Sequence, residues 1–182
     1  MRILALPGSL RRGSYNRGLI RAAQELAPDD VTIDVFDLRA LPFFDADVEA
    51  HGDPRPVHAL KEAIASADAL LIATPEYNHG VPGVLKNAID WASRPKASTV
   101  LAGKPVAIMG AGGVNGTMYA QEQLREHLRS SRANVLDEPR VAVARAWERF
   151  DEHGDVIDPD VQVDVGFLID ALRRKVAATV RV

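Results

Sequence analysis

Serine, arginine and asparagine side chains follow the first apolar stretch of the chain, in a short loop that also contains glycines. Ser9, Ser14 and Asn16 supply neutral hydrogen-bonding groups, and Arg11 and Arg12 supply cationic donors. A helical pattern begins directly afterwards, and the free N–H groups and dipole of a helix N-terminus favour an anion. The loop therefore predicts a phosphate site. In the alternative interpretation it is a polar turn in which Ser14 or Asn16 caps the helix, which leaves both arginines unexplained.

The same residues exclude two other loop chemistries. No Gly-Lys-Ser/Thr sequence ends the loop, so it is not an ATP-binding P-loop. The G-x-S-x-G pattern is also missing, so Ser9 is not the nucleophile of an α/β-hydrolase.

A second polar loop, residues 75–80 (PEYNHG), follows an apolar stretch that has the length of a buried strand. Pro82 then stands at the expected first position of a helix, where its missing N–H costs nothing. Loops of this kind bind ligands at the carboxyl ends of strands in α/β sheets, so we expect this one to line a pocket. Structural alternatives remain open: the Glu76 side chain caps a turn or pairs with an arginine, and Tyr77 packs under the loop.

A third loop, residues 110–116, has the glycines of a dinucleotide-binding fingerprint but not their spacing. Gly110 and Gly112 are followed by Asn115 where a third glycine belongs. The fingerprint also belongs after the first strand, with an acidic residue about 20 positions further on. A Rossmann-type NAD site is therefore rejected. Glycines at a strand end still permit close approach to a flat or phosphorylated ligand, and the alternative is a flexible turn.

The composition excludes several classes of partner and chemistry. The 182 residues carry a formal net charge of −3, which argues against bulk attraction to nucleic acid or to an anionic membrane. With neither a run of about 18 apolar residues nor a signal-peptide pattern, we expect no membrane insertion and a cytoplasmic location. The absence of cysteine excludes disulfides, thiolate nucleophiles and iron–sulfur clusters. No histidine pair or aspartate cluster has metal-ligand spacing, so we predict no metal.

Strands and helices alternate along the chain. Apolar stretches typical of strands cover residues 2–6, 31–36, 69–73, 105–109 and 135–143, the last interrupted by Pro139. Helical periodicity covers residues 17–27, 57–67, 82–91, 117–130 and 159–176, whereas residues 38–56 are expected to be an irregular excursion over the surface. The alternation predicts a parallel sheet with helices on both faces. Five of each suit a single flavodoxin-like doubly wound α/β domain over residues 1–182, with strand order 2-1-3-4-5.

Residues 8–16 (GSLRRGSYN) and 74–91 (TPEYNHGVPGVLKNAIDW) together closely resemble the NADPH-dependent FMN reductase family. Members of this family include flavin, quinone, chromate and azo-dye reductases. The second motif is long and specific, and the first stands at the expected place. Beyond residue 130 the resemblance rests on the order of elements, and the third loop is richer in glycine than in many relatives.

The resemblance implies FMN as cofactor and NADPH or NADH as co-substrate, in a homodimer or homotetramer. It assigns Ser9, Arg11, Ser14 and Asn16 to the FMN phosphate, Pro75, Glu76, Tyr77 and Asn78 to the isoalloxazine ring and ribityl chain, and Gly112 and Gly113 to the other side of the ring.

The implied activity is an FMN-dependent NAD(P)H oxidoreductase that passes hydride through FMN to a flavin, quinone, azo compound or similar small acceptor, by a ping-pong mechanism. The difficult step belongs to the cofactor, so no side chain is predicted to be catalytic. The alternatives are a flavodoxin-type electron carrier without its own NAD(P)H turnover and, more distantly, an FMN-free regulatory protein. The sequence leaves open the acceptor, the choice of NADPH or NADH, whether FMN is retained or exchanged, and dimer against tetramer.

Overall fold

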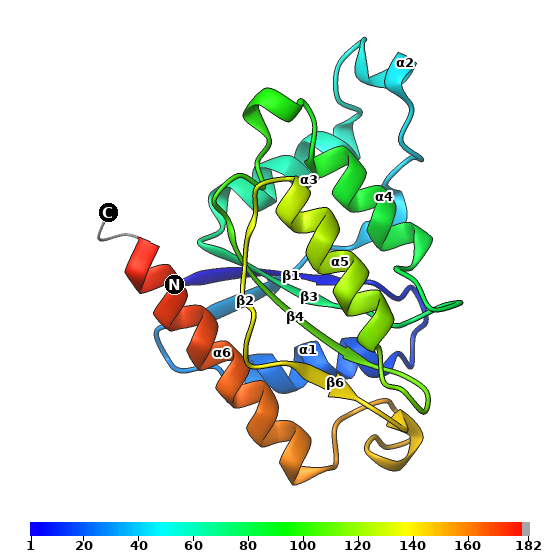
Figure 1. Ribbon diagram of the computed structural model, residues 1–182, viewed down its shortest axis with the longest axis vertical. Coiled ribbons are helices and arrows are strands. Elements are labelled where there is room, and N and C mark those ends of the chain that lie inside the picture. Colours follow the sequence, from blue (N-terminus) through cyan, green and yellow to red (C-terminus); the bar gives the residue numbers. More distant parts are fainter. Residues whose placement is uncertain (180–182) are drawn as a thin grey trace.

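A parallel β-sheet lies between two layers of helices in the computed structural model, which describes residues 1–179 (Figure 1). The strands are β1 (Arg2–Pro7), β2 (Thr32–Val35), β3 (Ala69–Ala73), β4 (Pro105–Ala111), β5 (Asn134–Val135) and β6 (Val141–Val143). The helices are α1 (Tyr15–Leu26), α2 (Ala46–Glu49), α3 (Arg55–Ser66), α4 (Gly83–Ala92), α5 (Met118–Ser130) and α6 (Pro159–Thr179). The sheet order β2-β1-β3-β4-β5 confirms the predicted doubly wound topology. No helix among these residues is long and apolar enough to cross a membrane.

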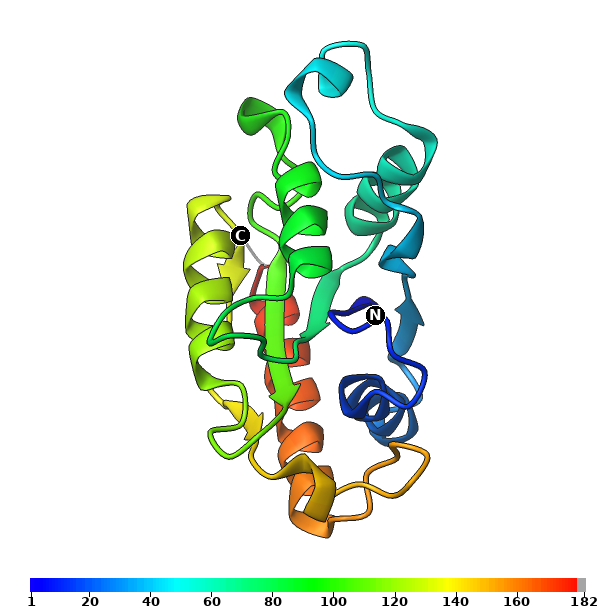
Figure 2. The same ribbon diagram turned by 90° about the vertical axis from the view of Figure 1, so that its right-hand side faces the viewer.

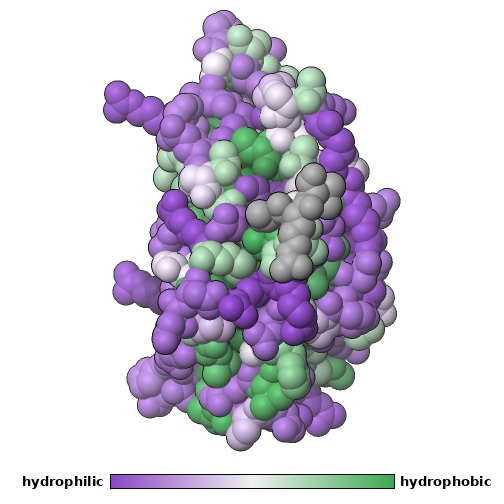
Figure 3. Space-filling model, turned by 90° about the vertical axis from the view of Figure 1, so that its left-hand side faces the viewer, coloured by the Kyte–Doolittle hydropathy of each residue, from purple (hydrophilic) through white to green (hydrophobic). Residues whose placement is uncertain are grey.

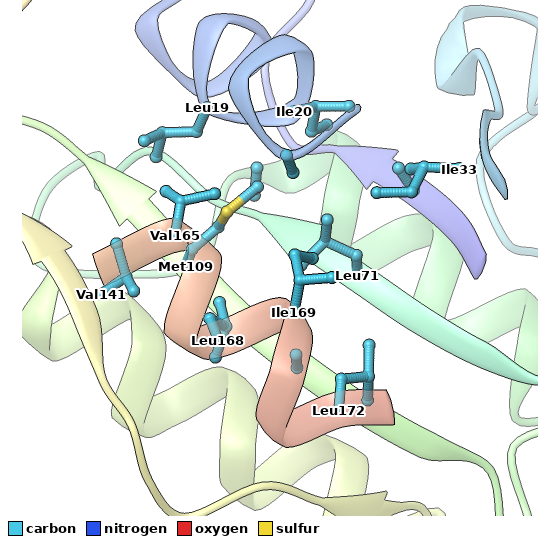
Figure 4. Packing of buried hydrophobic residues seen from close by; sticks show 14 of the residues in the cluster. Leu19, Ile20, Ile33, Leu71, Met109, Val141, Val165, Leu168, Ile169 and Leu172 are labelled. Atoms are coloured by element: carbon cyan, nitrogen blue, oxygen red, sulfur yellow. The ribbon is translucent and has the colours of Figure 1, made fainter. Parts of the chain in front are cut away.

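The two central strands, β3 and β4, are buried along their whole length because helices cover both faces of the sheet. Their side chains alternate between the faces. Leu71 and Met109 pack with α1 and α6, as Figure 4 shows. Leu70 and Ile72 pack with α3, α4 and α5 on the opposite face. Each fully buried leucine or isoleucine contributes about 1.5–3 kcal/mol relative to an exposed one, so the centre of the sheet contributes much of the stability of the fold.

The edge of the sheet differs from the prediction of one strand over residues 135–143. Two short strands occupy this range: β5 pairs with Pro105 and Val106 at the start of β4, and β6 pairs with its last three residues, 109–111. Between them the chain leaves the sheet. Pro139 lies in this interruption and has no N–H to donate to a strand ladder.

Several boundaries also shift. The first helix begins at Tyr15 rather than at residue 17, and Pro82 lies immediately before α4 instead of within its first turn.

The excursion over residues 38–56 contains the short helix α2, and it is attached to α4 by hydrogen bonds. The Trp91 indole N–H donates to the carbonyl of Pro42 at 2.9 Å. The Asn87 side chain also donates to the carbonyl of Pro42 and accepts the N–H of Phe44, so α4 holds this loop at both residues.

Candidate functional site

The carboxyl ends of β1, β3 and β4 lie next to one another and carry the three polar loops (Figure 2). A cavity of about 350 Å³ lies among these loops. Its walls combine residues distant in the sequence: Ser9, Arg11, Ser14, Tyr15, Asn16, Pro75, Glu76, Tyr77, Ala111, Gly112 and Gly113. The structure therefore brings together every predicted site residue except Asn78.

The first loop presents polar groups that the fold leaves available. Ser9 is 4% exposed, and its hydroxyl oxygen accepts the N–H of Arg11 at 3.3 Å. Ser14 immediately precedes α1 and is 3% exposed, and within residues 1–179 its side chain makes no capping hydrogen bond to the helix. The alternative in which Ser14 serves as a helix cap is therefore not supported. A buried hydroxyl at a helix N-terminus, with the helix N–H groups beside it, suits an anionic oxygen.

Asn16 lies within the first turn of α1 and connects the first loop to the third. Its side-chain Nδ2 donates to the carbonyl of Ala111 at 2.9 Å, and its Oδ1 accepts the N–H of Ala111 at 3.0 Å. Asn16 is 3% exposed and Ala111 2% exposed. The amide thus does not cap α1. It fixes the distance between two cavity walls.

Positive charge surrounds the first loop. Arg11 lies on the cavity, Arg17 donates from Nε to the carbonyl of Ser9 at 3.4 Å, and Arg39 donates to the carbonyl of Leu10. Asp37 is the carboxylate beside this group. The backbone N–H of Arg39, together with the guanidinium groups of Arg39 and Arg17, holds the pKa of Asp37 below its ordinary value. A ligand phosphate would enter a region where cations exceed carboxylates.

The second loop closes as a tight two-residue turn. Tyr77 and Gly80 exchange backbone hydrogen bonds of 3.2 and 3.0 Å. Asn78 and His79 occupy the tip with φ angles of 50° and 58°, a left-handed conformation that asparagine tolerates better than most residues. Asn78 is exposed and lies outside the cavity walls, so its place is explained by turn geometry.

Glu76 uses its carboxylate within the protein. One oxygen accepts the N–H of Ala120, in the first turn of α5, at 3.0 Å. The other lies 3.4 Å from Nδ1 of His79, and the Glu76 side chain is 10% exposed. A carboxylate at a helix N-terminus is stabilised by the free N–H groups there. Glu76 therefore ties the second loop to α5; it caps the N-terminus of a helix, rather than capping a turn or pairing with an arginine.

The third loop is held by backbone hydrogen bonds rather than being a flexible turn. The N–H of Gly112 donates to the carbonyl of Val143 at 3.0 Å, and its carbonyl accepts the N–H of Ala146 at 3.0 Å. The carbonyl of Gly113 accepts the N–H of Arg145 at 2.8 Å. The last residue of the short strand β6 and the residues directly after it, 143–146, thus fix the glycine wall of the cavity.

The comparisons with known proteins agree with this geometry. Residues 1–148 match the model of the NADPH-dependent FMN reductase family. The chain belongs to this family. An NAD(P)H-dependent FMN reductase of Pseudomonas aeruginosa is 44% identical over 159 residues, which cover 87% of this chain and 85% of that protein. A 2-hydroxy-1,4-benzoquinone reductase of a Burkholderia species is 40% identical over 182 residues, covering 100% of this chain and 97% of that one.

A solved structure leads to the same conclusion. The flavoenzyme NAD(P)H:(acceptor) oxidoreductase FerB of Paracoccus denitrificans superposes with a TM-score of 0.88 at 32% identity, over 98% of both chains. This FMN reductase family member is therefore an oxidoreductase with FMN as cofactor and NAD(P)H as co-substrate. The electron-carrier alternative is not favoured, because the relatives are reductases.

Two wall residues were missed by the sequence analysis. Tyr15 belongs to the first motif but was not assigned a contact, and Ala111 precedes the assigned glycines. Both are next to predicted site residues in the sequence, so their position in the loop is the feature that could have identified them. Their side-chain types gave no indication.

Proposed function

We propose that this cavity holds FMN, with the phosphate at the first loop and the isoalloxazine ring between the second and third loops. The observation that carries the proposal is the convergence of all three loops on one cavity. Its volume, about 350 Å³, lies within the range of about 300–1,000 Å³ typical of small-molecule sites. In this assignment the whole chain acts as one cytoplasmic FMN-binding reductase domain.

The residues of the cavity bind and orient rather than react. Arg11 and the hydroxyls of Ser9 and Ser14 hold the phosphate, while Asn16 keeps the first and third loops at the right separation. Gly112 and Gly113 present backbone to one side of the ring, and Pro75 and Tyr77 lie on the second loop. When bound, FMN accepts hydride from the nicotinamide and passes electrons to the acceptor.

The acceptor that we propose is a quinone, a flavin or a similar flat molecule. The support comes from the 2-hydroxy-1,4-benzoquinone reductase and the NAD(P)H-dependent FMN reductase among the relatives. FMN fills this cavity and leaves one face of its ring open, so nicotinamide and acceptor use that face in turn. The reaction is then ping-pong.

Two measurements test this activity. Anaerobic NADPH should bleach the visible absorption of the flavin-loaded protein before any acceptor is added. In steady-state kinetics with NADPH and a benzoquinone, double-reciprocal plots should be parallel. Intersecting lines would contradict the ping-pong mechanism, and a protein that stays colourless after soaking in FMN would contradict the cofactor site.

Replacing Arg11 by alanine is expected to weaken FMN binding about ten- to a hundredfold, because a charge-assisted hydrogen bond to phosphate is lost. Turnover at saturating FMN should change much less. Arg12→Ala is the matched control: it removes the same charge from the same loop, but Arg12 is not on the cavity wall. Equal FMN occupancy in Arg11→Ala and the wild type, measured by flavin fluorescence, would refute the phosphate assignment.

We also propose a homodimer in which the partner covers the rim of this cavity. Tyr77, Val114, Met118 and Tyr119 are apolar side chains 54–68% exposed, and all lie in the second loop, the third loop or the start of α5. The face around the chain termini is different: it is mostly hydrophilic with small separate apolar areas (Figure 3). Light scattering that reports a monomer mass of 19.7 kDa would exclude the dimer.

A further inference from the structure

A turn formed by residues 150–156, just before α6, lies against the start of α1 and close to the first loop (Figure 2). No motif of the sequence analysis covers this turn, and it does not line the cavity itself. One of its residues nevertheless contacts a residue that lines the cavity beside the first loop.

The turn is internally well connected. Phe150 and Val156 form an antiparallel bridge at its base. The carboxylate of Asp151 accepts the N–H groups of His153 at 2.9 Å and Asp155 at 2.8 Å. These backbone hydrogen bonds hold the pKa of Asp151 below its ordinary value.

The turn is fitted closely to α1. A Cβ atom on Gly18 would lie 1.8 Å from the carbonyl oxygen of Gly154, so only glycine permits this approach. Arg21, one turn further along α1, donates to the same carbonyl at 3.1 Å and pairs with the carboxylate of Asp155.

An aromatic and cationic stack continues from the turn to the cavity. The ring of Phe150, which is 4% exposed, lies 4.9 Å from the ring of Tyr15 at an angle of 43°. The guanidinium of Arg11 lies 5.2 Å from the centre of the same Tyr15 ring. Tyr15 and Arg11 are both wall residues of the cavity. Tilted aromatic pairs and cation–π contacts restrict the orientation of their members.

We propose that the turn of residues 150–156 orients the phosphate-binding side of the cavity, with Phe150 as a positioning residue that acts through Tyr15 on Arg11. The inference rests on the proposed FMN site. The inference predicts that changes in the turn weaken the binding of a ligand that carries a phosphate more than the binding of the same ligand without it. A turn that merely covers α1 would support stability alone.

The test compares the affinities of FMN and riboflavin, which differ by the phosphate. Phe150→Leu keeps an apolar side chain but removes the ring, and Arg21→Ala removes the side chain of α1 that holds Gly154 and Asp155 of the turn. Leu168→Ala is the control, because Leu168 is 0% exposed in the same core cluster but lies on α6, outside the cavity walls. Binding is titrated by flavin fluorescence at a temperature at which circular dichroism shows each variant folded.

Phe150→Leu should weaken FMN binding about three- to tenfold and change riboflavin binding less than about twofold. Arg21→Ala should change the ratio of FMN affinity to riboflavin affinity in the same direction but by less. If Phe150→Leu does not fold, the Arg21→Ala variant decides the test. Leu168→Ala should lower the melting temperature without changing the ratio. An unchanged ratio in the folded turn variants overturns the inference. A wild type that binds neither ligand, or both equally, overturns the FMN site instead.

Discussion

Replacing Asn16 by alanine should lower the free energy of unfolding by about 2–4 kcal/mol and weaken FMN binding in the same variant. The Asn16 amide pairs with both the N–H and the carbonyl of Ala111, at 3.0 and 2.9 Å, and both residues are buried. Alanine leaves two backbone groups unpaired, and it also removes the link between two cavity walls. Denaturant unfolding and FMN titration measure the two effects separately.

Asn87 provides a matched control. Its amide also spans a backbone N–H and a carbonyl, those of Phe44 at 2.8 Å and Pro42 at 2.9 Å, and Asn87 is 7% exposed. It lies on α4, outside the cavity walls. Asn87→Ala should therefore lose similar stability but keep its FMN affinity. Equal FMN affinities in the two variants, both folded, would show that Asn16 has no special part in the site.

The variant Gly110→Ala is expected to be destabilised by about 3 kcal/mol or more, because two buried groups oppose any added atom. A Cβ on Gly110 would lie 2.0 Å from Oγ1 of Thr117 and 2.5 Å from the carbonyl oxygen of Thr74. Thr74 and Thr117 are both 0% exposed, so neither can move aside easily. Gly110 lies near the end of β4, so the third loop should shift with it and FMN binding should weaken. For a chain of this length the melting temperature should fall by about 6–12 °C.

Gly166→Ala is the opposite case. Gly166 lies within α6, and a Cβ there would meet nothing within 4 Å. Alanine in a helix interior is favoured over glycine by about 0.5–1 kcal/mol, so this variant should melt at a slightly higher temperature. If calorimetry finds Gly110→Ala as stable as Gly166→Ala, the close packing at the end of β4 is not as described.

The central part of the fold and the meeting of the three polar loops followed from local patterns. Strand and helix periodicities are short-range signals, and their alternation leaves few arrangements for a parallel sheet. Once β1, β3 and β4 are neighbours, their polar loops must meet at one edge. The edge strand was predicted less well, because a two-residue and a three-residue strand interrupted at Pro139 carry too little pattern to place.

Tertiary structure alone decided what the individual side chains do. The sequence marks Asn16, Glu76 and Asn78 as polar loop residues. Only the fold shows that the first pairs with Ala111, 95 positions away, and the second with the N-terminus of α5. Asn78 is turned to the tip of its loop by left-handed backbone angles. The turn of residues 150–156 likewise has no local signal of its role. Residue type and spacing record which groups can bind a phosphate or a ring, whereas packing over long sequence separations selects the partners that they meet.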